Sequence, residues 1–586
     1  MFKTKRSFFL LLFLVVMFGL LKPRQIIASL NPISIPNNKF GVHISAPGKE
    51  EILQAADLVN SQGGDWGYVT VVIQSNDRDK TKWQNFFDEL RRSHLIPIVR
   101  IATKPVGDYW EIPVDNDSLE WANFLDSLNW PTVNRYVVIY NEPNHGQEWG
   151  TAVDPASYAK ILDKTIDSLR AKSSNFFVLN AGLDASVPHQ PPNYYDAARF
   201  VVEMENAVPG ILEKLDGWTS HSYPNPDFKS SPYKTGRGSV RTFEWEQGLL
   251  SSLGLKKNLP IFITETGWKH AEGVEYDSFL PTSKEIGQYF RIAFQDVWNN
   301  PNIVAITPFI LNYTDYPFDH FSFKRVEKED DSLSRVLGEK FPNYYPQYDS
   351  LKEIVKVKGE PVQEDKFEVV DANFQKIITT DQVYSFDFTL KNTGQSIWNE
   401  FGGVKLGLLK TIENLEIQDA TLPIEKKIEP GQDYIFKIQV KAIRNGTYEV
   451  PLSLFKQSEV FQNKPIRLYI EVNDPVMLSV NVKTRFGKID GVYSLEFKTE
   501  DQIVNDALAV SSMGESEKIK QPRISPGTSY KITIRKSFYK SKTVIQTLNS
   551  GENKIEFGVL DIDFKEVSRE FLRKIALFFS LDKKSS

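Results

Sequence analysis

Cysteine is absent from this chain of 586 residues. A chain without cysteine has no disulfide framework, no thiolate metal site and no cysteine nucleophile. A strong excess of one charge is absent too, because 70 basic residues stand against 75 acidic ones and give a formal net charge of -5. Such a balance does not favour binding to nucleic acid, so we expect no nucleic-acid partner. Low-complexity tracts are missing and 41% of the residues are apolar, which together predict about two to four folded domains.

Patterns for metal and cofactor sites are missing as well. The seven histidines are scattered, and no His-x-x-x-His spacing or aspartate cluster with ligand spacing occurs. No glycine-rich phosphate loop and no Gly-x-Ser-x-Gly elbow is present either. We therefore expect neither a metal ion nor a cofactor.

The first 30 residues have the pattern of an export segment. Lys3, Lys5 and Arg6 precede an uninterrupted apolar run over residues 8–21, and Lys22 and Arg24 follow it. A basic start before a run of this length is typical of a secretory signal peptide, and the run is short for a membrane span. Residues 1–30 are therefore predicted to be a signal peptide or an N-terminal membrane anchor attached through residues 7–21. In either case the protein is expected to be exported, secreted or held on the outer side of the cytoplasmic membrane.

The composition of the chain changes near residue 360. All seven histidines and ten of the eleven tryptophans precede residue 321. Over residues 36–360, short apolar runs alternate with segments whose apolar residues recur every three or four positions, as in amphipathic helices. Eight strands that alternate with helices predict an α/β fold, a (β/α)8 TIM barrel. The predicted strands cover residues 40–44, 68–73, 96–101, 136–140, 176–181, 217–222, 261–264 and 303–311.

Beyond residue 360 the helical period gives way to short alternating strands. Turn sequences such as Asn392-Thr393-Gly394 and Pro430-Gly431 separate them, which is typical of β-sandwiches. We expect two all-β sandwich-like domains, over residues 361–474 and 475–562. Residues 563–586 form an amphipathic tail with helical spacing, too short to span a bilayer. Packing of that helix on its own domain is the favoured expectation, and a position on a membrane surface is the alternative.

Two carboxylates directly follow predicted strands four and seven. Glu142 stands in Asn141-Glu142-Pro143 after the fourth strand, and Glu265 follows the seventh. The carboxyl ends of barrel strands share one active-site mouth, and these two strands lie across the barrel from each other. A pair of carboxylates about 5–5.5 Å apart is what a retaining glycosidase uses, one as acid/base and one as nucleophile.

Other polar and aromatic residues are expected to bind substrate around this pair. Asn141 is suited to hydrogen-bond a sugar hydroxyl, and Arg100, at the end of strand three, would keep Glu265 ionised. His221 and Tyr223 follow strand six and can orient the carboxylates. His43, at the end of strand one, either points into the pocket or lies in the core. Aromatic residues in strand-end loops are candidates to stack on a sugar ring: Trp110, Trp149, Trp268, Tyr313 and Tyr316.

The two motifs together resemble those of clan A of the glycoside hydrolases, the retaining (β/α)8 group that includes families 5 and 39. The resemblance rests on Asn141-Glu142-Pro143 after strand four and on residues 264–268, Thr-Glu-Thr-Gly-Trp, after strand seven. It covers roughly residues 36–358 and implies that Glu142 is the acid/base and Glu265 the nucleophile. The clan often carries a tryptophan at the end of strand eight, and residues 308–313 contain none. Residues 361–474 resemble, more loosely, the immunoglobulin-like domains appended to many exported bacterial enzymes, and the motifs that carry this likeness lie between Asn392 and Tyr448.

Three functions follow as hypotheses. The first is hydrolysis of O-glycosidic bonds, β-linked ones, in a poly- or oligosaccharide by double displacement. The second is a barrel that binds glycans without cutting them. The third is a cell-surface scaffold in which the β domains carry the function. The two carboxylates at matching strand ends favour the first.

Overall fold

The structure, a computed structural model, describes residues 29–581 apart from residues 115, 327–342, 462 and 522. The predicted signal peptide or anchor, with its apolar run, lies outside the described residues except for residues 29 and 30. Within the part that is described, no helix has the length and apolarity needed to cross a membrane. The chain divides into two compact units: the first runs to Glu364 and includes Gly394–Ser396, and the second holds the rest.

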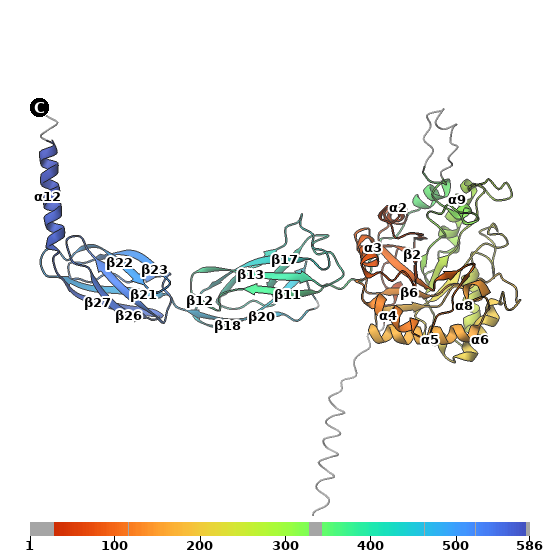
Figure 1. Cartoon of the computed structure of the whole chain (residues 1–586), viewed down its shortest axis with the longest axis horizontal. Coiled ribbons are helices and arrows are strands. Elements are labelled where there is room, and N and C mark those ends of the chain that lie inside the picture. Colours follow the sequence, from red (N-terminus) through yellow and green to blue (C-terminus); the bar gives the residue numbers. More distant parts are fainter. Residues whose placement is uncertain (1–28, 115, 327–342, 462, 522, 582–586) are drawn as a thin grey trace, which may run out of the picture. The chain divides into compact units, whose positions relative to one another are not determined.

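Among the described residues of the first unit, eight parallel strands follow one another in the order that the sequence predicted. Two of them, β2 and β6, are labelled in Figure 1. Five of them form one sheet in the order β1-β2-β3-β6-β7, and three form another in the order β10-β9-β8. All eight coincide with predicted strands. Their bounds are Gly41–His43 (β1), Gly67–Gln74 (β2), Leu95–Ala102 (β3), Arg135–Ile139 (β6), Phe176–Leu179 (β7), Trp218–His221 (β8), Ile261–Glu265 (β9) and Ile303–Ile306 (β10).

Parallel pairings at two seams close the two sheets into a barrel. Leu179 pairs with Gly217 between β7 and β8, and Phe40 pairs with Ile306 between β10 and β1. A glycine stands at each seam because a side chain would not fit. A Cβ on Gly217 would lie 2.8 Å from Leu179, and one on Gly41 would lie 2.6 Å from Thr307. The predicted (β/α)8 barrel is thereby confirmed.

Two apolar layers hold the barrel together. Side chains that point inward, such as Tyr68, Tyr136 and Phe262, fill its interior, and a larger cluster lies between strands and helices. Strands buried on both faces explain why the predicted runs were almost continuously apolar. The surrounding helices are α2 (Lys49–Val59), α3 (Lys80–Arg92), α4 (Asp117–Asp126), α5 (Pro155–Lys172), α6 (Ala197–Ala207), α7 (Ile211–Lys214), α8 (Thr242–Ser252), α9 (Ser283–Ile292) and α11 (Pro346–Lys352). Shorter elements are η1 (Pro32–Ser34), η2 (Gly146–Glu148), η3 (Ala293–Val297), η4 (Phe318–Phe321) and the hairpin of β4 (Pro105–Val106) and β5 (Tyr109–Trp110).

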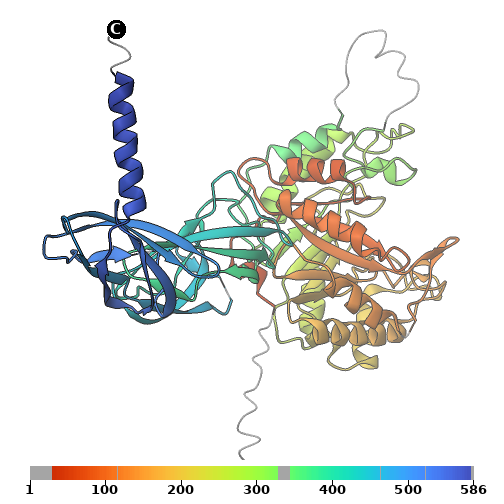
Figure 2. The ribbon, with the colours of Figure 1, turned by 60° about the vertical axis from the view of Figure 1, so that its left-hand side comes forward.

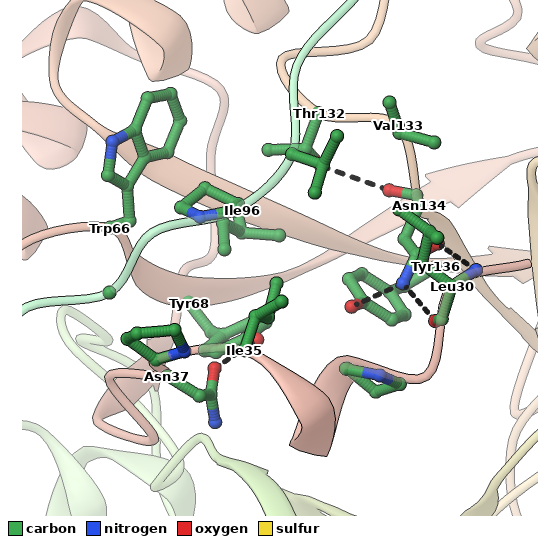
Figure 3. A pocket seen from close by; sticks show the side chains of 15 residues that line it. Leu30, Ile35, Asn37, Trp66, Tyr68, Ile96, Thr132, Val133, Asn134 and Tyr136 are labelled. Atoms are coloured by element: carbon green, nitrogen blue, oxygen red, sulfur yellow. Dashed lines mark hydrogen bonds between the residues drawn. The ribbon is translucent and has the colours of Figure 1, made fainter.

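The segment around η1 closes the amino-terminal end of the barrel (Figure 3). The backbone of Leu30 makes two hydrogen bonds with the side chain of Asn134, at 3.1 and 2.8 Å. Tyr68 donates to Asn37 at 2.6 Å. The cavity that remains has a volume of about 20 Å³, room for one water molecule. This end is therefore packed for stability, and the polar residues of interest lie at the opposite end.

The second unit contains two β-sandwich-like domains, as predicted. In the first, one sheet has the order β11-β13-β17-β15 and the other β12-β20-β18-β14-β16, with β19 beside β18, around one core. In the second, the sheets β24-β21-β27 and β23-β22-β25-β26 enclose a separate core. The strands are β11 (Phe367–Asn373), β12 (Ile377–Thr379), β13 (Val383–Asn392), β14 (Val404–Leu408), β15 (Leu415–Gln418), β16 (Ala420–Thr421), β17 (Asp433–Ala442), β18 (Gly446–Lys456), β19 (Glu459–Val460), β20 (Ile466–Asn473), β21 (Val476–Thr484), β22 (Gly491–Lys498), β23 (Ile503–Val510), β24 (Ile519–Gln521), β25 (Thr528–Arg535), β26 (Lys542–Leu548) and β27 (Gly551–Leu560).

The predicted tail is a single helix, α12 (Phe564–Leu581), visible after the last strand in Figures 1 and 2. The expectation that it packs on its own domain is wrong. Phe571 and Leu572 are 65% and 64% exposed, and Phe564 is 71% exposed. Its apolar side chains therefore face solvent along the length whose side chains are described.

Candidate active site

Glu142 and Glu265 come together at the carboxyl ends of the barrel strands. Glu142 lies three residues after the end of β6, and Glu265 is the last residue of β9. One oxygen of each carboxylate and one ring nitrogen of His221 all lie within 4.8 Å of one another. Glu265 is only 8% exposed. Two carboxylates from opposite arcs of the barrel thus face one small volume.

Glu265 is held as an anion by its neighbours. The Arg100 guanidinium, from β3, donates to one carboxylate oxygen, and Tyr223 Oη donates to the other at 3.0 Å. Burial alone would raise the pKa of Glu265, but the charges of His221 and Arg100 lower it to about 2. Burial and the charge of Glu265 raise the pKa of Tyr223, so its hydroxyl stays a donor. An ionised, buried carboxylate with oriented donors is what a nucleophile requires.

Arg100 also connects the two sides of the site. Its Nη1 donates to the side-chain oxygen of Asn141 at 2.7 Å, besides its bond to Glu265. The side chain of Asn141 also hydrogen-bonds the carboxyl group of Glu148. The Arg100 guanidinium thus links Glu265 to Asn141 across the site.

Glu142 stands on a strained turn and is paired with histidine. Its φ is 30°, and the φ of Tyr140 is 69°, both in the left-handed region that non-glycine residues seldom adopt. His221 Nδ1 lies 2.7 Å from a Glu142 oxygen and 3.8 Å from Glu265. Burial opposes protonation of His221, yet the charge of Glu265 and the bond to Glu142 outweigh it and raise the pKa of the imidazole. Backbone strain at a partly buried acidic residue is typical of a functional position.

The imidazole of His221 lies directly over Gly182, which follows β7. A Cβ on Gly182 would stand 2.1 Å from the Cδ2 atom of His221. His221 itself is 2% exposed. Only glycine at residue 182 leaves room for this ring.

Gly182→Ala is therefore expected to displace His221 and to lower kcat/KM about 10- to 100-fold, the cost of a lost hydrogen bond to a charged group. The fold should remain, because the three atoms nearest to the added methyl group all belong to the side chain of His221. Turnover measured beside thermal unfolding checks this expectation. Gly248→Ala on α8, where a Cβ meets nothing within 4 Å, is the control. Wild-type turnover in Gly182→Ala would contradict it.

His43 points toward the site but stays neutral. Burial and the charge of Arg100 lower the pKa of His43 to about 3, although Glu265 acts in the opposite direction. Its ring packs edge-on against Phe309 at 5.2 Å. The sequence left open whether His43 points into the pocket or lies in the core. The imidazole is buried, 3% exposed, and neither ring nitrogen has a hydrogen-bond partner among the described residues.

Two residues that the sequence did not single out support Glu142. His145 Nε2 lies 3.1 Å from Asp184 and 4.0 Å from a Glu142 oxygen. Burial disfavours the charged form of His145, but the bond to Asp184 and the charge of Glu142 raise its pKa. Asp184 is in the loop after β7, so sequence spacing gave no sign of this pairing.

A third carboxyl group, that of Glu148 in η2, lines a small hollow beside the two carboxylates. A hollow of about 70 Å³ beside the pair is bounded by Glu148, Asn141, Arg100 and Trp110, among others. Burial and the charge of Glu142 raise the pKa of Glu148 to about 7. Near neutral pH this group is therefore partly protonated. Its position six residues after Glu142 in a loop offered no recognisable motif.

The aromatic residues predicted to stack on a sugar ring do not all lie at the mouth of the barrel. Trp268 is 1% exposed, its indole N–H donates to Ser230 at 2.7 Å, and its ring packs on Phe290. The structure therefore puts Trp268 behind Glu265, in the core, where it cannot stack on a sugar. Tyr313 is half-buried and packs edge-on against Phe318 at 5.9 Å. Trp110 lies closer to the carboxylates because it lines the hollow beside Asn141.

Glu142, His221 and Glu265 have the donor types and the spacing of a metal site. Each is already engaged, because Arg100 binds Glu265 and His221 binds Glu142. A guanidinium on a carboxylate ligand adds positive charge where a cation would sit, and this repulsion disfavours metal binding. The two carboxylates are better suited to act on a carbon atom of a neutral, hydroxyl-rich substrate that lies between them.

Comparisons with solved structures give enzymes that act on glycosides. A family 39 glycoside hydrolase from Bacteroides cellulosilyticus is 11% identical, with a TM-score of 0.37, over 71% of this chain and 82% of that one. A β-mannanase from Thermomonospora fusca is 15% identical, with a TM-score of 0.32, over 50% and 83%. A glucosidase from Croceicoccus marinus is 8% identical, with a TM-score of 0.35, over 84% and 95%. No protein family and no curated protein matches the chain. The eight-stranded barrel itself is the fold that the resemblance to clan A glycoside hydrolases predicted.

Proposed function

We propose that this protein is a retaining glycoside hydrolase that cleaves β-linked glycosidic bonds of a poly- or oligosaccharide. One observation carries the proposal: carboxylate oxygens of Glu142 and Glu265 approach within 4.8 Å. Retaining enzymes hold their two carboxyl groups about 5–5.5 Å apart, whereas inverting enzymes need about 6.5–9.5 Å to admit a water molecule. The separation supports the first class.

In the first half of the reaction, a Glu265 oxygen attacks the anomeric carbon and the bond from that carbon to the leaving oxygen breaks. Glu142 gives its proton to that oxygen, and a glycosyl ester of Glu265 remains. Arg100 and Tyr223 keep Glu265 ionised and aimed, while Asn141 is placed to bind a hydroxyl beside the reacting carbon. Such contacts strengthen as the oxocarbenium-like transition state forms.

In the second half, Glu142 takes a proton from water, and the water oxygen attacks the anomeric carbon from the side that the leaving group vacated. The bond to Glu265 breaks and the sugar leaves with its original configuration. Two inversions give net retention. His221, bonded to Glu142 at 2.7 Å, orients the carboxyl group in both halves.

The substrate is proposed to lie outside the cytoplasmic membrane. The basic residues and apolar run of the first 30 residues support this placement, since they are typical of an export segment. Whether that segment is cleaved or retained as an anchor would be read from the N-terminus of the protein isolated from its cells.

The test is hydrolysis of a panel of β-linked polysaccharides and aryl β-glycosides by the full chain, with Glu265→Gln as the blank. Turnover by the wild type alone, with the anomeric signal of the first product followed by NMR, would establish the class and the stereochemistry. A first product of inverted configuration would contradict the retaining assignment. Binding without turnover would support the non-catalytic alternative.

Arg100→Gln is expected to move the acidic limb of the kcat/KM profile to higher pH. The guanidinium lowers the pKa of Glu265, so its removal raises that pKa, and the nucleophile is protonated sooner as the pH falls. Loss of an adjacent opposite charge moves a carboxyl pKa by about 1–3 units. Values of kcat/KM on an aryl glycoside, measured between pH 3 and 9, give the pH at which the acidic limb lies. Arg135→Gln, which removes a surface partner of Asp126, should leave it in place.

A further inference from the structure

A polar hollow of about 510 Å³ lies on the Glu142 side of the mouth, in the loops after β7 and β8. Its lining includes Ser186, Asn225, Lys234 and Arg237. Pockets of 300–1,000 Å³ are the usual size for small-molecule ligands. None of these residues belongs to the catalytic arrangement described above.

Contacts lead from this hollow to both catalytic carboxylates. The backbone N–H of Ser186 donates to Asp184 at 2.7 Å, and Asp184 binds His145 next to Glu142. On the other side, Phe228 of the hollow's loop packs on Tyr223, the donor to Glu265, at 5.0 Å. Glu142 is the proposed proton donor to the leaving group. The hollow lies beside the residues that support this proton donor.

The walls of the hollow are firmly built. Asn225 donates to Ser186 Oγ at 2.9 Å, and the guanidinium of Arg237 donates to the Ala185 carbonyl and binds Asp196 at 2.6 Å. Gly238 has a φ of 69°, and a Cβ there would lie 2.8 Å from Ser186 Oγ. The two loops are thus locked to each other at a close approach that requires glycine.

The charges of the hollow favour an anion. Arg237 is neutralised by Asp196, and Asp227 is paired with Lys229 at 3.4 Å. Lys234 instead donates to the backbone carbonyl of Asn225 at 2.5 Å, a bond that leaves its charge without compensation among the described residues. Tyr233 beside it is 66% exposed and offers a ring face.

We propose that this hollow binds a sugar residue that carries an anionic group, carboxylate or sulfate, on the leaving-group side of the cleaved bond. The proposal rests on the proposed glycosidase function. Lys234 supplies the charge, and Ser186 and Asn225 supply hydrogen bonds to hydroxyl groups. The protein would then prefer acidic polysaccharides to neutral ones of the same backbone.

The test compares Lys234→Ala with the wild-type chain on two kinds of substrate, with Lys160→Ala on the outer face of α5 as control. An aryl glycoside leaves the hollow empty, so on this substrate kcat/KM of Lys234→Ala should equal that of the wild type. On acidic polysaccharides, uronate-containing and sulfated, kcat/KM should fall about tenfold or more, and its sensitivity to salt should fall with it. No turnover of any aryl glycoside by the wild type would contradict the glycosidase function itself. If Lys234→Ala and the wild type cleave acidic polysaccharides at equal rates, the proposed anion-binding role of the hollow is wrong, while the glycosidase function stands.

A second, independent feature is the exposed helix α12. Asp563 begins it, accepting from the N–H groups of Lys565 and Glu566 at 3.0 and 3.3 Å. Phe571, Leu572 and Phe564 are each more than 60% exposed, and single helices rarely leave such a row uncovered. We therefore expect a binding partner to cover this row of apolar side chains on α12.

The order of charges around α12 identifies that binding partner. At about 100° per residue, the apolar residues Phe564, Val567, Phe571, Leu572 and Ile575 fall within an arc of about 140°, wider than a coiled-coil seam. Basic residues border the arc on both sides, Lys565 and Arg569 on one and Lys574 on the other. The side opposite the arc holds Glu566, Glu570, Arg573 and Leu577, and there Arg573 pairs with Glu570 at 2.8 Å. Cations at both edges of an apolar face suit a helix lying on an anionic lipid surface.

We infer that α12 lies in the interface of an anionic membrane, with Phe571 and Leu572 inserted. Because the chain contains no cysteine, a single cysteine can be introduced and labelled cleanly. Leu572→Cys and Glu566→Cys, each carrying an environment-sensitive fluorophore, place a probe on the apolar face and on the opposite face of the full chain. The comparison remains valid even if the N-terminal segment also binds vesicles.

With vesicles of phosphatidylglycerol and phosphatidylcholine, the probe at residue 572 should shift to the blue and the probe at residue 566 should not. Each basic residue of α12 that is replaced by glutamine should weaken this response about fivefold. An equal blue shift at residue 572 with vesicles of phosphatidylcholine alone would show that the charge of the membrane plays no part in binding. A shift at residue 572 that depends on protein concentration without vesicles would overturn the proposal and indicate a second copy of the chain. No shift at residue 572 would also overturn it.

Discussion

Glu265→Gln is expected to remove turnover of every glycoside that the wild-type chain cleaves. Glutamine keeps the shape and a hydrogen bond to Tyr223, but it is neutral and cannot form the ester with the anomeric carbon. Loss of a covalent nucleophile costs on the order of 10⁴-fold or more in rate. Arg100 would lose its counter-ion, so folding is checked by thermal unfolding.

The measurement is trapping with a 2-deoxy-2-fluoro glycoside followed by mass spectrometry. Wild-type protein should gain the mass of one sugar, and the labelled peptide should contain Glu265. Glu275→Gln, an exposed residue of the same loop, should be labelled like the wild type. Label on any peptide without residue 265, or label in Glu265→Gln, would sink the assignment.

Glu142→Gln is expected to separate substrates by their leaving groups. A glycoside whose leaving oxygen needs a proton should react about 10²- to 10⁴-fold more slowly, the usual contribution of a general acid. An aryl glycoside with an acidic phenol needs no proton to depart, so its first step should change little. Its glycosyl ester should then accumulate, because Glu142 no longer activates water.

Rates on a series of aryl glycosides of rising phenol pKa measure this effect, and added azide provides a second readout. Azide needs no general base, so it should restore turnover and yield a glycosyl azide of retained configuration. An equal loss across the whole series, with no rescue by azide, would show that Glu142 is not the acid/base. Glu111→Gln, in the loop after β5, serves as the unaffected control.

The strands and the two carboxylates were predictable because their sequence patterns are local. A parallel strand buried on both faces must be apolar over its length, and an acidic residue directly after it has few structural reasons to be there. The supporting residues of Glu142 were not predictable. Asp184 and Glu148 reach the site only through the path of loops, which carries no periodic pattern.

Trp268 and α12 show where residue type alone misleads. A tryptophan after a catalytic strand is compatible with a platform at the mouth, but the turn at Gly267, with a φ of 132°, is followed by an indole that lies in the core. For α12, the pattern predicted an apolar face correctly but did not tell what covers it. Packing partners are a property of the whole fold: near its start α12 contacts its domain where the Phe538 N–H donates to Glu566, while Phe571 and Leu572 stay exposed.

The two seams of the barrel set the distance on which the chemistry depends. Glu142 extends from the five-stranded arc and Glu265 from the three-stranded arc, so their separation is a property of how these arcs meet. The carboxyl groups of an inverting pair stand at least about 1 Å farther apart than those of a retaining pair. The spacing behind the proposed retaining mechanism therefore depends on positions away from the carboxylates, Gly41 and Gly217, where the absence of a methyl group lets the arcs close.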